Sequence, residues 1–374
     1  MVCTWRRMAY YHPYPSVPSV TTVLLISAVT LSLLIWSFSI RPYYRKDATW
    51  GSTPLGLRTG MISNGTLPFL YALALKMNPI SWLTGISHER LQIYHQWLAR
   101  IALLFAWIHS IAFLIDDSRP GPPWEMLKKW WTYSPWCYDT GVAALIAMSW
   151  LLLSSTRVVR DAGYQFFYLN HIASNCLFLG FYFAHTDDMM HSWRWLWPVV
   201  GVWVGSTLGK WVRSGLFVGR GRVVGAQRGY LRIEVEVPRR FRAKAGQHVF
   251  LRFPTLRGWQ SHPFTIASDR QEEQDSDITH RNLLFLIREA KGLTRTLANA
   301  VRSKPGGEQI LDLPVILDGP YGSTWKLASY DAVLLIAGGA GISFVLPLLQ
   351  DLARKRGRHD ADFFCQRVQL VWAM

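Results

Sequence analysis

The sequence predicts a membrane α-helical bundle, followed by a small antiparallel β-barrel and then by part of an α/β domain. Half of the 374 residues are hydrophobic and only 17% are charged, against about 25% in typical soluble domains. The apolar residues are concentrated before about position 217, and the segments that follow alternate between apolar and polar residues. The end of the chain reads as strand, glycine-rich turn, helix and strand, which is the order of an α/β unit.

Six runs with few or no charges approach the length of about 20 residues that crosses a bilayer. The predicted spans are Val20–Ile40, Thr59–Leu75, Leu91–Ile115, Thr140–Thr156, Ala162–Thr186 and Trp195–Gly209. The last span extends to Phe217 if Lys210 and Arg213 reach the interface with their long side chains. Arg6 and Arg7 precede the first run, as in a signal peptide, but the run is long and no small-residue cleavage site follows it. We therefore expect a retained helix.

The charge and cysteine content exclude several classes of protein. The formal charge of +16 with 50% hydrophobic residues excludes a disordered tail, a collagen-like chain and a disulfide-rich secreted module. The four cysteines have neither CxxC pairing nor metal-ligand spacing. A basic chain could bind nucleic acid, but the concentration of apolar residues indicates lipid instead. With the N-terminus inside, inner segments hold ten basic residues and outer loops eight, which barely favours this orientation.

Four histidines occur at one repeated spacing in two of the predicted spans. His95 and His109 lie in the third span, and His171 and His185 lie in the fifth. Both pairs are separated by 14 residues, which is close to four helical turns, so each pair shares one helix face. Because one span separates these two helices, they run in the same direction. His95 is then level with His171, and His109 with His185.

Two such helices facing each other would form two bis-histidine cages, one near each leaflet, about 21 Å apart along the axis. Paired imidazoles are suitable axial ligands for haem iron in electron transfer. A single histidine in a membrane helix could instead simply bond to a neighbour, but two pairs at equal spacing favour haem. Arg100 follows His95 by five residues; it could pair with a haem propionate or lie at the interface.

The segments after Phe217 predict a small antiparallel barrel. Leu231–Val237 and His248–Phe253 alternate apolar and polar residues, and the glycines of Gly219–Gly221 and Gly225–Gly229 predict turns. Asp269–Asn282 is an acid-rich segment that predicts a solvated loop.

Two segments of this part could contact a ligand. The sequence HPFTIAS, residues 262–268, places an aromatic ring among hydroxyl groups, which could hold a flat heterocycle or could be ordinary core. Gly292 directly precedes a predicted helix, Leu293–Arg302, and Thr294 lies in its first turn. Lys291 and Arg295 lie beside these two residues. This helix start could bind a diphosphate or could be a simple cap.

The final segment predicts a nucleotide-binding turn. A tight turn is expected at Asp318–Gly322, and the buried strand Ala332–Ala337 runs into the glycine-rich Gly338–Ser343. Strand, glycine turn and helix bring backbone amides against a dinucleotide phosphate, although the spacing here is not GxGxxG. Beyond the turn we expect a helix at Phe344–Ala353, a charged loop at Arg354–Asp362 and a strand at Val368–Trp372.

Taken together, these segments resemble the ferric reductase and NADPH oxidase superfamily, and most closely the fungal ferric-chelate reductases. The resemblance covers nearly the whole chain. It rests on the two H-x13-H pairs, PLGLRTG before the second span, NPISWLTG before the third, HPFTIAS, GPYG and GGAGIS.

The resemblance implies a set of cofactor-binding residues. Two b-type haems would be bound by His95, His109, His171 and His185. FAD would be held by His262, Pro263, Phe264, Thr265 and Ser268, with Gly292, Thr294 and Arg295 near its diphosphate. NADPH would lie against Gly319, Pro320, Tyr321 and Gly322 and against Gly338, Gly339, Gly341 and Ser343.

The resemblance also implies a domain order and an activity. Residues 1–217 would be the haem-binding membrane domain, 218–325 the FAD-binding barrel and 326–374 an incomplete NADPH-binding domain. Electrons from cytosolic NADPH would pass by way of FAD and the haems to ferric chelates outside a multi-pass plasma-membrane protein that serves iron uptake.

Two alternative functions stay open at this stage. A superoxide-generating NADPH oxidase would use the same ligands, whereas an incomplete nucleotide domain would also suit a non-catalytic haem protein. Members of the superfamily continue past the second nucleotide-domain strand, so we expect this chain to be a fragment that NADPH reduces slowly or not at all. The oligomeric state is not predicted.

Overall fold

A computed structural model describes residues 11, 18–45, 53–119, 122, 124–125, 128, 132, 135–225, 229–238, 240–257, 260–270, 280–304, 310–322, 326–358 and 361–373. Arg6, Arg7, residues 226–228 of the expected Gly225–Gly229 turn and residues 271–279 of the expected acidic loop lie outside this description. The chain packs as two compact units, Met1–Ile80 with His88–Gly205, and Ser81–Ser87 with Ser206–Met374.

The long helices lie in the first unit, except that the last of them belongs to the second unit from Ser206 on, and each overlaps one predicted span. They are α2 (Val20–Ser39), α3 (Pro54–Ala74), α5 (His88–Ser118), α7 (Pro135–Ser154), α9 (Tyr164–Thr186) and α10 (Trp193–Leu216), with the short elements α4 (Pro79–Thr84), α8 (Arg157–Ala162) and η1 (Met189–His191) between them. The motif PLGLRTG, expected ahead of the second span, instead forms the first turns of α3. Its leading proline suits a first helical turn, where the missing N–H is not needed.

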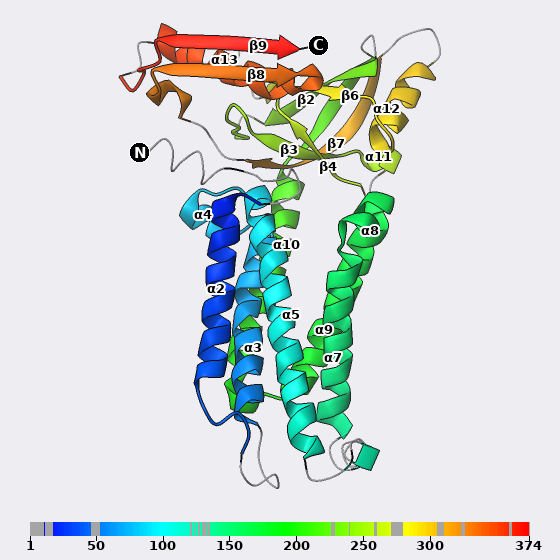
Figure 1. The fold of residues 1–374 in the computed structure, drawn as a ribbon. Coiled ribbons are helices and arrows are strands. Elements are labelled where there is room, and N and C mark those ends of the chain that lie inside the picture. Colours follow the sequence, from blue (N-terminus) through cyan, green and yellow to red (C-terminus); the bar gives the residue numbers. More distant parts are fainter. Residues whose placement is uncertain are drawn as a thin grey trace. The chain divides into compact units, whose positions relative to one another are not determined.

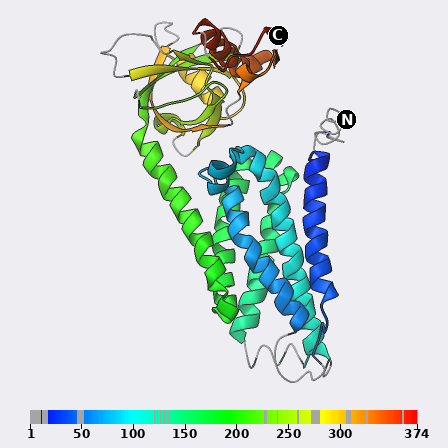
Figure 2. The same cartoon turned by 90° about the vertical axis from the view of Figure 1, so that its left-hand side faces the viewer.

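Helices α3 and α5 pack against each other, as do α7 and α9 (Figure 1; Figure 2). The Ser63 hydroxyl of α3 donates to the Ala102 carbonyl of α5 over 3.0 Å. The Trp150 indole N–H of α7 donates to the Asn170 side-chain oxygen of α9 over 3.1 Å. Such bonds satisfy polar groups that an apolar surrounding would otherwise leave without a partner.

Among the described residues, three helices are long and apolar enough to cross a membrane. They are Val20–Ser39, His88–Asp116 and Trp136–Ser154. Their outward faces carry large apolar side chains such as Leu24, Ile111 and Ile146, as expected for helices that contact hydrocarbon.

The second unit contains a seven-stranded antiparallel sheet in the order β4-β3-β7-β1-β2-β6-β5. Its strands are β1 (Val218–Gly225), β2 (Tyr230–Pro238), β3 (His248–Arg252), β4 (His262–Thr265), β5 (Ser268–Arg270), β6 (His280–Arg288) and β7 (Ile310–Tyr321), and the helices α11 (Pro254–Arg257) and α12 (Leu293–Arg302) accompany them. The two edge strands, β4 and β5, follow each other in the chain. Between them, Ile266 N–H donates to Gln247 on one side and Ala267 N–H to Leu284 on the other, so the sheet nearly closes.

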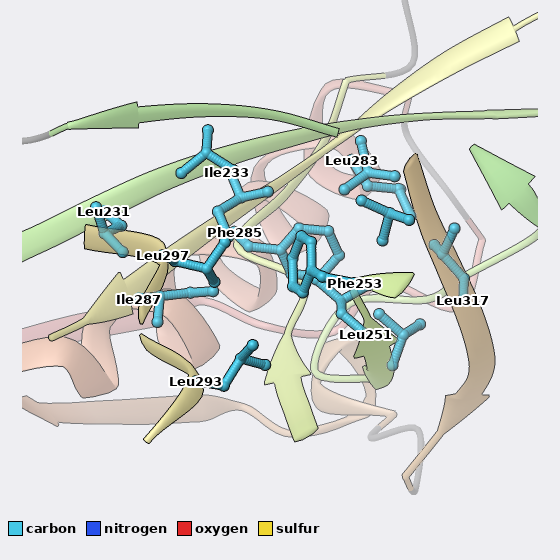
Figure 3. Packing of buried hydrophobic residues seen from close by; sticks show 14 of the residues in the cluster. Leu231, Ile233, Leu251, Phe253, Leu283, Phe285, Ile287, Leu293, Leu297 and Leu317 are labelled. Atoms are coloured by element: carbon cyan, nitrogen blue, oxygen red, sulfur yellow. The ribbon is translucent and has the colours of Figure 1, made fainter. Parts of the chain in front are cut away.

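The core of this barrel is built from alternate residues of its strands, as the period-2 pattern predicted. Ile233 of β2, Leu251 of β3 and Phe285 of β6 are completely buried. Leu293 and Leu297 of α12 enter the same cluster (Figure 3). The helix therefore supplies part of the barrel core.

Three local expectations for the second unit were wrong. Gly219 and Gly221 lie within β1 rather than in a turn. Glycine is needed at these positions because a Cβ would collide with Glu236 or Val315 on the neighbouring strands. Residues 269–270 and 280–282 extend β5 and β6 instead of forming loop. Residues 318–321 complete β7, where a bulge sets Asp318 opposite Phe250 and Tyr321 opposite His248.

The α/β part of the second unit is a parallel strand pair with one crossover helix. It comprises η4 (Leu327–Ser329), β8 (Ala332–Gly338), η5 (Gly339–Gly341), α13 (Ile342–Gly357) and β9 (Arg367–Ala373). The helix runs four residues into the expected loop, because its last turn carries Arg354, Lys355 and Arg356, which interact favourably with the helix dipole. Apolar side chains such as Ile336 and Trp372 are exposed on this sheet, so the strand expected to be buried is buried only at alternate residues.

Candidate functional site

His109 of α5 is held against the first turns of α3. Its Nδ1 lies 2.8 Å from the Gly56 carbonyl oxygen. Because a carbonyl can only accept, Nδ1 carries the proton and Nε2 keeps its lone pair. A Cβ built on Gly60 would lie 2.6 Å from the same Nδ1, so the ring rests directly on this glycine.

His185 of α9 is held in the same way against the first turns of α7. Its Nδ1 donates to the Cys137 carbonyl oxygen over 2.8 Å. A Cβ on Gly141 would lie 2.7 Å from the ring. The thiol of Cys137 is 3.9 Å from Nδ1, so the carbonyl is the closer acceptor.

The two imidazoles form a facing pair, as the spacing predicted. The His109 and His185 ring centroids are 6.1 Å apart and their planes are at 80°. Phe113 packs on His109 at 4.9 Å and Tyr182 on His185 at 6.4 Å. Within the described ranges, no group of three or more His, Cys, Asp and Glu side chains gathers that could hold a metal ion.

His95 and His171 occupy the other level, four turns along the same two helices. His95 Nδ1 lies 3.0 Å from the Leu70 carbonyl oxygen of α3. His171 Nδ1 lies 3.0 Å from the Ser155 hydroxyl, whose proton goes to the Leu151 carbonyl. The hydroxyl oxygen therefore accepts from His171, and all four histidines present Nδ1 to a neighbouring helix or its end.

Arg100 lies on α5 with its guanidinium 4.5 Å from the centre of the Trp97 ring. The residue is exposed. An arginine stacked on an indole is common where a helix meets the membrane interface. This contact is compatible with both alternatives for Arg100.

The expected flavin motif forms β4 and lies beside the start of β3. His262 is paired with Leu251, and Thr265 is paired with His248. Pro263 is exposed, and Phe264 packs against the barrel core. Burial lowers the pKa of the His262 imidazole, so this ring is neutral at pH 7. Ser268 begins β5.

The strand β3 brings the expected flavin and nicotinamide motifs together. His248 has Thr265 of β4 on one side and Tyr321 of β7 on the other. A Cβ on Gly322, whose φ is +101°, would lie 3.4 Å from His248 Nδ1. The sequence did not single out His248, because its importance depends on which strands become its neighbours.

Arg213, near the end of α10, is bonded to the last residues of β7. Its Nη2 donates to the Asp318 carboxylate over 2.9 Å and to the Tyr321 hydroxyl, which in turn donates to Asp318 over 2.6 Å. Burial and the Asp318 charge raise the pKa of the Tyr321 phenol, which keeps its proton. The helix itself runs to Leu216, close to the end at Phe217 that the extended sixth span predicts.

The expected diphosphate site lies at the start of α12, a helix that packs on β1, β7 and α11. Gly292 has φ +80°, a conformation that favours glycine. The Thr294 hydroxyl accepts from the Ala290 N–H over 2.8 Å, as in a local cap, while Arg295 is exposed. The cap and a diphosphate site are compatible here, since the remaining amides still point out of the helix.

The second expected phosphate turn joins β8 to α13. Gly338 ends β8, and Gly339 and Gly341 lie in η5. Ser343 is the second residue of α13, and its hydroxyl donates to the Ala340 carbonyl over 2.9 Å. Phe344, one residue further, lies against Gly246, where a Cβ would be 3.3 Å from its ring. Because Gly246 precedes His248 by two residues, the residue that follows this turn lies near the start of β3, where the β4 and β7 motifs also meet.

Comparison with known families matches the whole of this order. Residues 59–182 match the ferric reductase like transmembrane component, 222–325 an FAD-binding domain and 330–374 the ferric reductase NAD binding domain. The first match includes His95, His109 and His171 and ends three residues before His185, and the second includes the β4 and β7 motifs.

Curated fungal proteins match over most of the chain. It is 30% identical to the probable cell surface ferric reductase kap2 of Aspergillus oryzae, over 98% of this chain and 51% of the relative. It is 32% identical to ferric/cupric reductase transmembrane component 7 of Saccharomyces cerevisiae, over 93% and 55%. Ferric reductase transmembrane component 4 of the same yeast is 29% identical over 85% and 42%. The chain thus spans about half the length of the curated relatives it matches.

The order of the matched regions, the apolar helices and these relatives agree with one another. This chain belongs to the fungal ferric reductase family, a family of membrane proteins, and it contains transmembrane, FAD-binding and NAD-binding regions.

Proposed function

We propose that this chain is the electron-carrying part of a transmembrane ferric-chelate reductase that serves iron uptake. In this proposal, NADPH is the cytosolic donor, FAD and two haems b are the cofactors, and ferric chelates are the external acceptors. The observation that carries the proposal is the facing pair His109 and His185, with both Nδ1 atoms bonded to neighbouring helices.

The residues present fit two bis-histidine haems. A histidine that binds a metal through one nitrogen usually donates its other N–H to a carbonyl or another acceptor, which fixes the ring and raises its basicity. All four histidines make such a contact. The ring centres of His109 and His185 are 6.1 Å apart, so these two rings would be the ones to hold one haem between them.

The second unit offers residues for FAD and for the nicotinamide nucleotide. His262, Pro263, Phe264, Thr265 and Ser268 would hold the flavin ring, and Gly292, Thr294 and Arg295 its diphosphate. Gly319, Pro320, Tyr321 and Gly322 would face the nicotinamide, and Gly338, Gly339, Gly341 and Ser343 the nucleotide phosphates. The pairing of the β4 and β7 motifs with the start of β3, and the contact of Phe344 with Gly246, support the assignment.

When bound, a flavin accepts two electrons as hydride and releases them singly, and haem iron carries them singly. The protein's part is to orient and to exclude water. The α3 and α7 carbonyls fix the planes of His109 and His185, and the neutral His262 adds no charge beside the proposed flavin site. A haem held by two histidines would have no open site for a substrate, which would suit electron transfer.

The domain limits and the topology belong to the same proposal. Residues 1–217 would bind haem in six membrane crossings, 218–325 would bind FAD and 326–374 would bind the nucleotide. With the flavin motifs in the cytosol, His95 and His171 bind the inner haem, and His109 and His185 bind the outer haem at the plasma membrane.

The central test is a visible spectrum of the purified full chain. Reduction with dithionite should give the sharp bands of low-spin haem, with two haems and one FAD per chain. A ferric chelate added next should reoxidise both haems. Chains without haem would contradict the proposal, and rapid oxygen consumption with superoxide release would favour the oxidase. No observation favours that alternative, since the matched relatives are named ferric reductases.

Protease protection tests the proposed topology. In sealed right-side-out vesicles, external protease should leave the segment after Phe217 intact, and detergent should expose it. Cleavage within β1–β7 before detergent is added would reverse the orientation.

A further inference from the structure

The two histidines of the proposed outer haem rest on glycines of the neighbouring helix. His109 bonds to the carbonyl of Gly56 and lies on Gly60, while His185 bonds to the carbonyl of Cys137 and lies on Gly141. In both cases the acceptor and the glycine are four residues apart. The same arrangement therefore occurs twice, on α3 and on α7.

Helix geometry explains why the residue four positions after the accepting carbonyl has to be glycine. The carbonyl of residue i accepts from the N–H of residue i+4, so its second lone pair opens beside that residue. The Cα–Cβ bond tilts toward the N-terminus of the helix, so a side chain at i+4 covers this lone pair. A Cβ at Gly60 or Gly141 would lie 2.6 or 2.7 Å from the imidazole, closer than two such atoms normally approach.

A short sequence repeat accompanies this arrangement. The first seven residues of α3, PLGLRTG, and of α7, PWCYDTG, share proline at the first position and Thr-Gly at the last two. The Thr59 hydroxyl contacts the Leu55 and Gly56 carbonyls at 2.9 and 3.1 Å. The Thr140 hydroxyl contacts the Trp136 and Cys137 carbonyls at 2.5 and 3.2 Å. The hydroxyl of each threonine is therefore bonded within its own helix, and the space beside the following glycine is occupied by the histidine ring.

The histidines of the proposed inner haem lack this feature. His95 bonds to the Leu70 carbonyl and His171 to the Ser155 hydroxyl. Among the glycines of the described ranges, Gly60 and Gly141 are the ones whose Cβ positions meet a paired histidine. A substitution at either glycine should therefore act on one haem and spare the other.

We propose that Gly60 and Gly141 are positioning residues for the outer haem, each forming with its helix carbonyl the seat that fixes an axial imidazole. This inference rests on the proposed function, because it assigns His109 and His185 as haem ligands. Neither glycine touches the iron; each acts through its histidine. The repeat Pro-x4-Thr-Gly is the sequence signature of the seat.

The test compares Gly60→Ala and Gly141→Ala with the wild-type full chain purified in detergent. Haem per chain is measured by the pyridine haemochrome spectrum, and the low-spin ferric signals are measured by electron paramagnetic resonance. Each variant should lose about half of the haem, or should keep it with one of two low-spin signals shifted. Alanine favours a helix more than glycine does, so a loss of haem in these variants could not be caused by a weaker helix.

Two alanine substitutions serve as matched controls. Gly65 lies on α3 and Gly180 on α9, and a Cβ at either position meets nothing within 4 Å. Gly65→Ala and Gly180→Ala should keep both haems and both signals. The haem at His95 and His171 reports in every variant whether the bundle has folded.

The outcomes separate this inference from the proposed function. Wild-type protein without haem would refute the proposed function. Two haems in the wild type and unchanged haem content and signals in Gly60→Ala and Gly141→Ala would overturn the inference alone. Equal loss of both haems, or equal loss in the controls, would also overturn it, because the seat is assigned to one pair of histidines.

Discussion

Replacing His109 with alanine should remove one of the two proposed haems and abolish reduction of an external ferric chelate, while flavin content stays the same. The Nδ1 bond to Gly56 holds this ring opposite His185 at 6.1 Å. Without the imidazole, the proposed outer haem would keep only His185, and the Gly56 carbonyl would lose its bond to Nδ1. Haem per chain, FAD per chain and chelate reduction with dithionite as the donor measure the three effects separately.

A second histidine of the same helix provides the control. His88 begins α5 and lies 3.1 Å from Glu89, outside both proposed haem levels. His88→Ala should keep both haems and the rate of chelate reduction. If His109→Ala also keeps both haems, then His109 is not an axial ligand and the outer site has to be reassigned.

Replacing Arg213 with alanine should destabilise the second unit by about 3 kcal/mol, because a largely buried carboxylate loses its cation. Asp318 is 4% exposed, and its ion pair with Arg213 is 2.9 Å long. The same guanidinium lies 4.6 Å from the centre of the Tyr321 ring, so this stacking contact is lost as well. The shift in the midpoint of chemical unfolding, followed by FAD fluorescence, measures the effect.

Two further variants make this prediction specific. Arg222 pairs with Asp312 over 3.4 Å, but both side chains are more than half exposed, so Arg222→Ala should change stability by less than about 1 kcal/mol. Adding Asp318→Asn to Arg213→Ala should restore part of the loss, because the buried charge is then removed as well. Equal effects of the two arginine substitutions would show that burial does not strengthen the Arg213–Asp318 pair.

The histidine arrangement was predictable because it depends on periodicity within single helices. A spacing of 14 residues fixes the face of an α-helix whatever its neighbours are, and His109 and His185 do face each other. The alternation in β2 likewise placed Ile233 in the barrel core. Such patterns are local, so the sequence shows them directly.

Contacts between distant segments were not predictable in the same way. Gly60 and Gly141 matter because a particular histidine of the next helix packs on them. The Pro-x4-Thr-Gly repeat is visible in the sequence, but its role follows only from the hydrogen bonds of His109 and His185 to the helices that carry it. Gly221 indicated a turn, and its role is instead the close approach of β7. Each of these depends on tertiary pairing rather than on local propensity.

The position of β7 in the sheet sets the order in which the barrel can assemble during synthesis. It is the last barrel strand in the chain, yet it lies between β3 and β1, with Val218 paired to Ile316 across almost a hundred residues. Until the ribosome has released Tyr321, β4-β3 and β1-β2-β6-β5 can form only as two partial sheets with open inner edges. Such edges pair readily with other chains, so the nascent barrel is most exposed to aggregation over this interval.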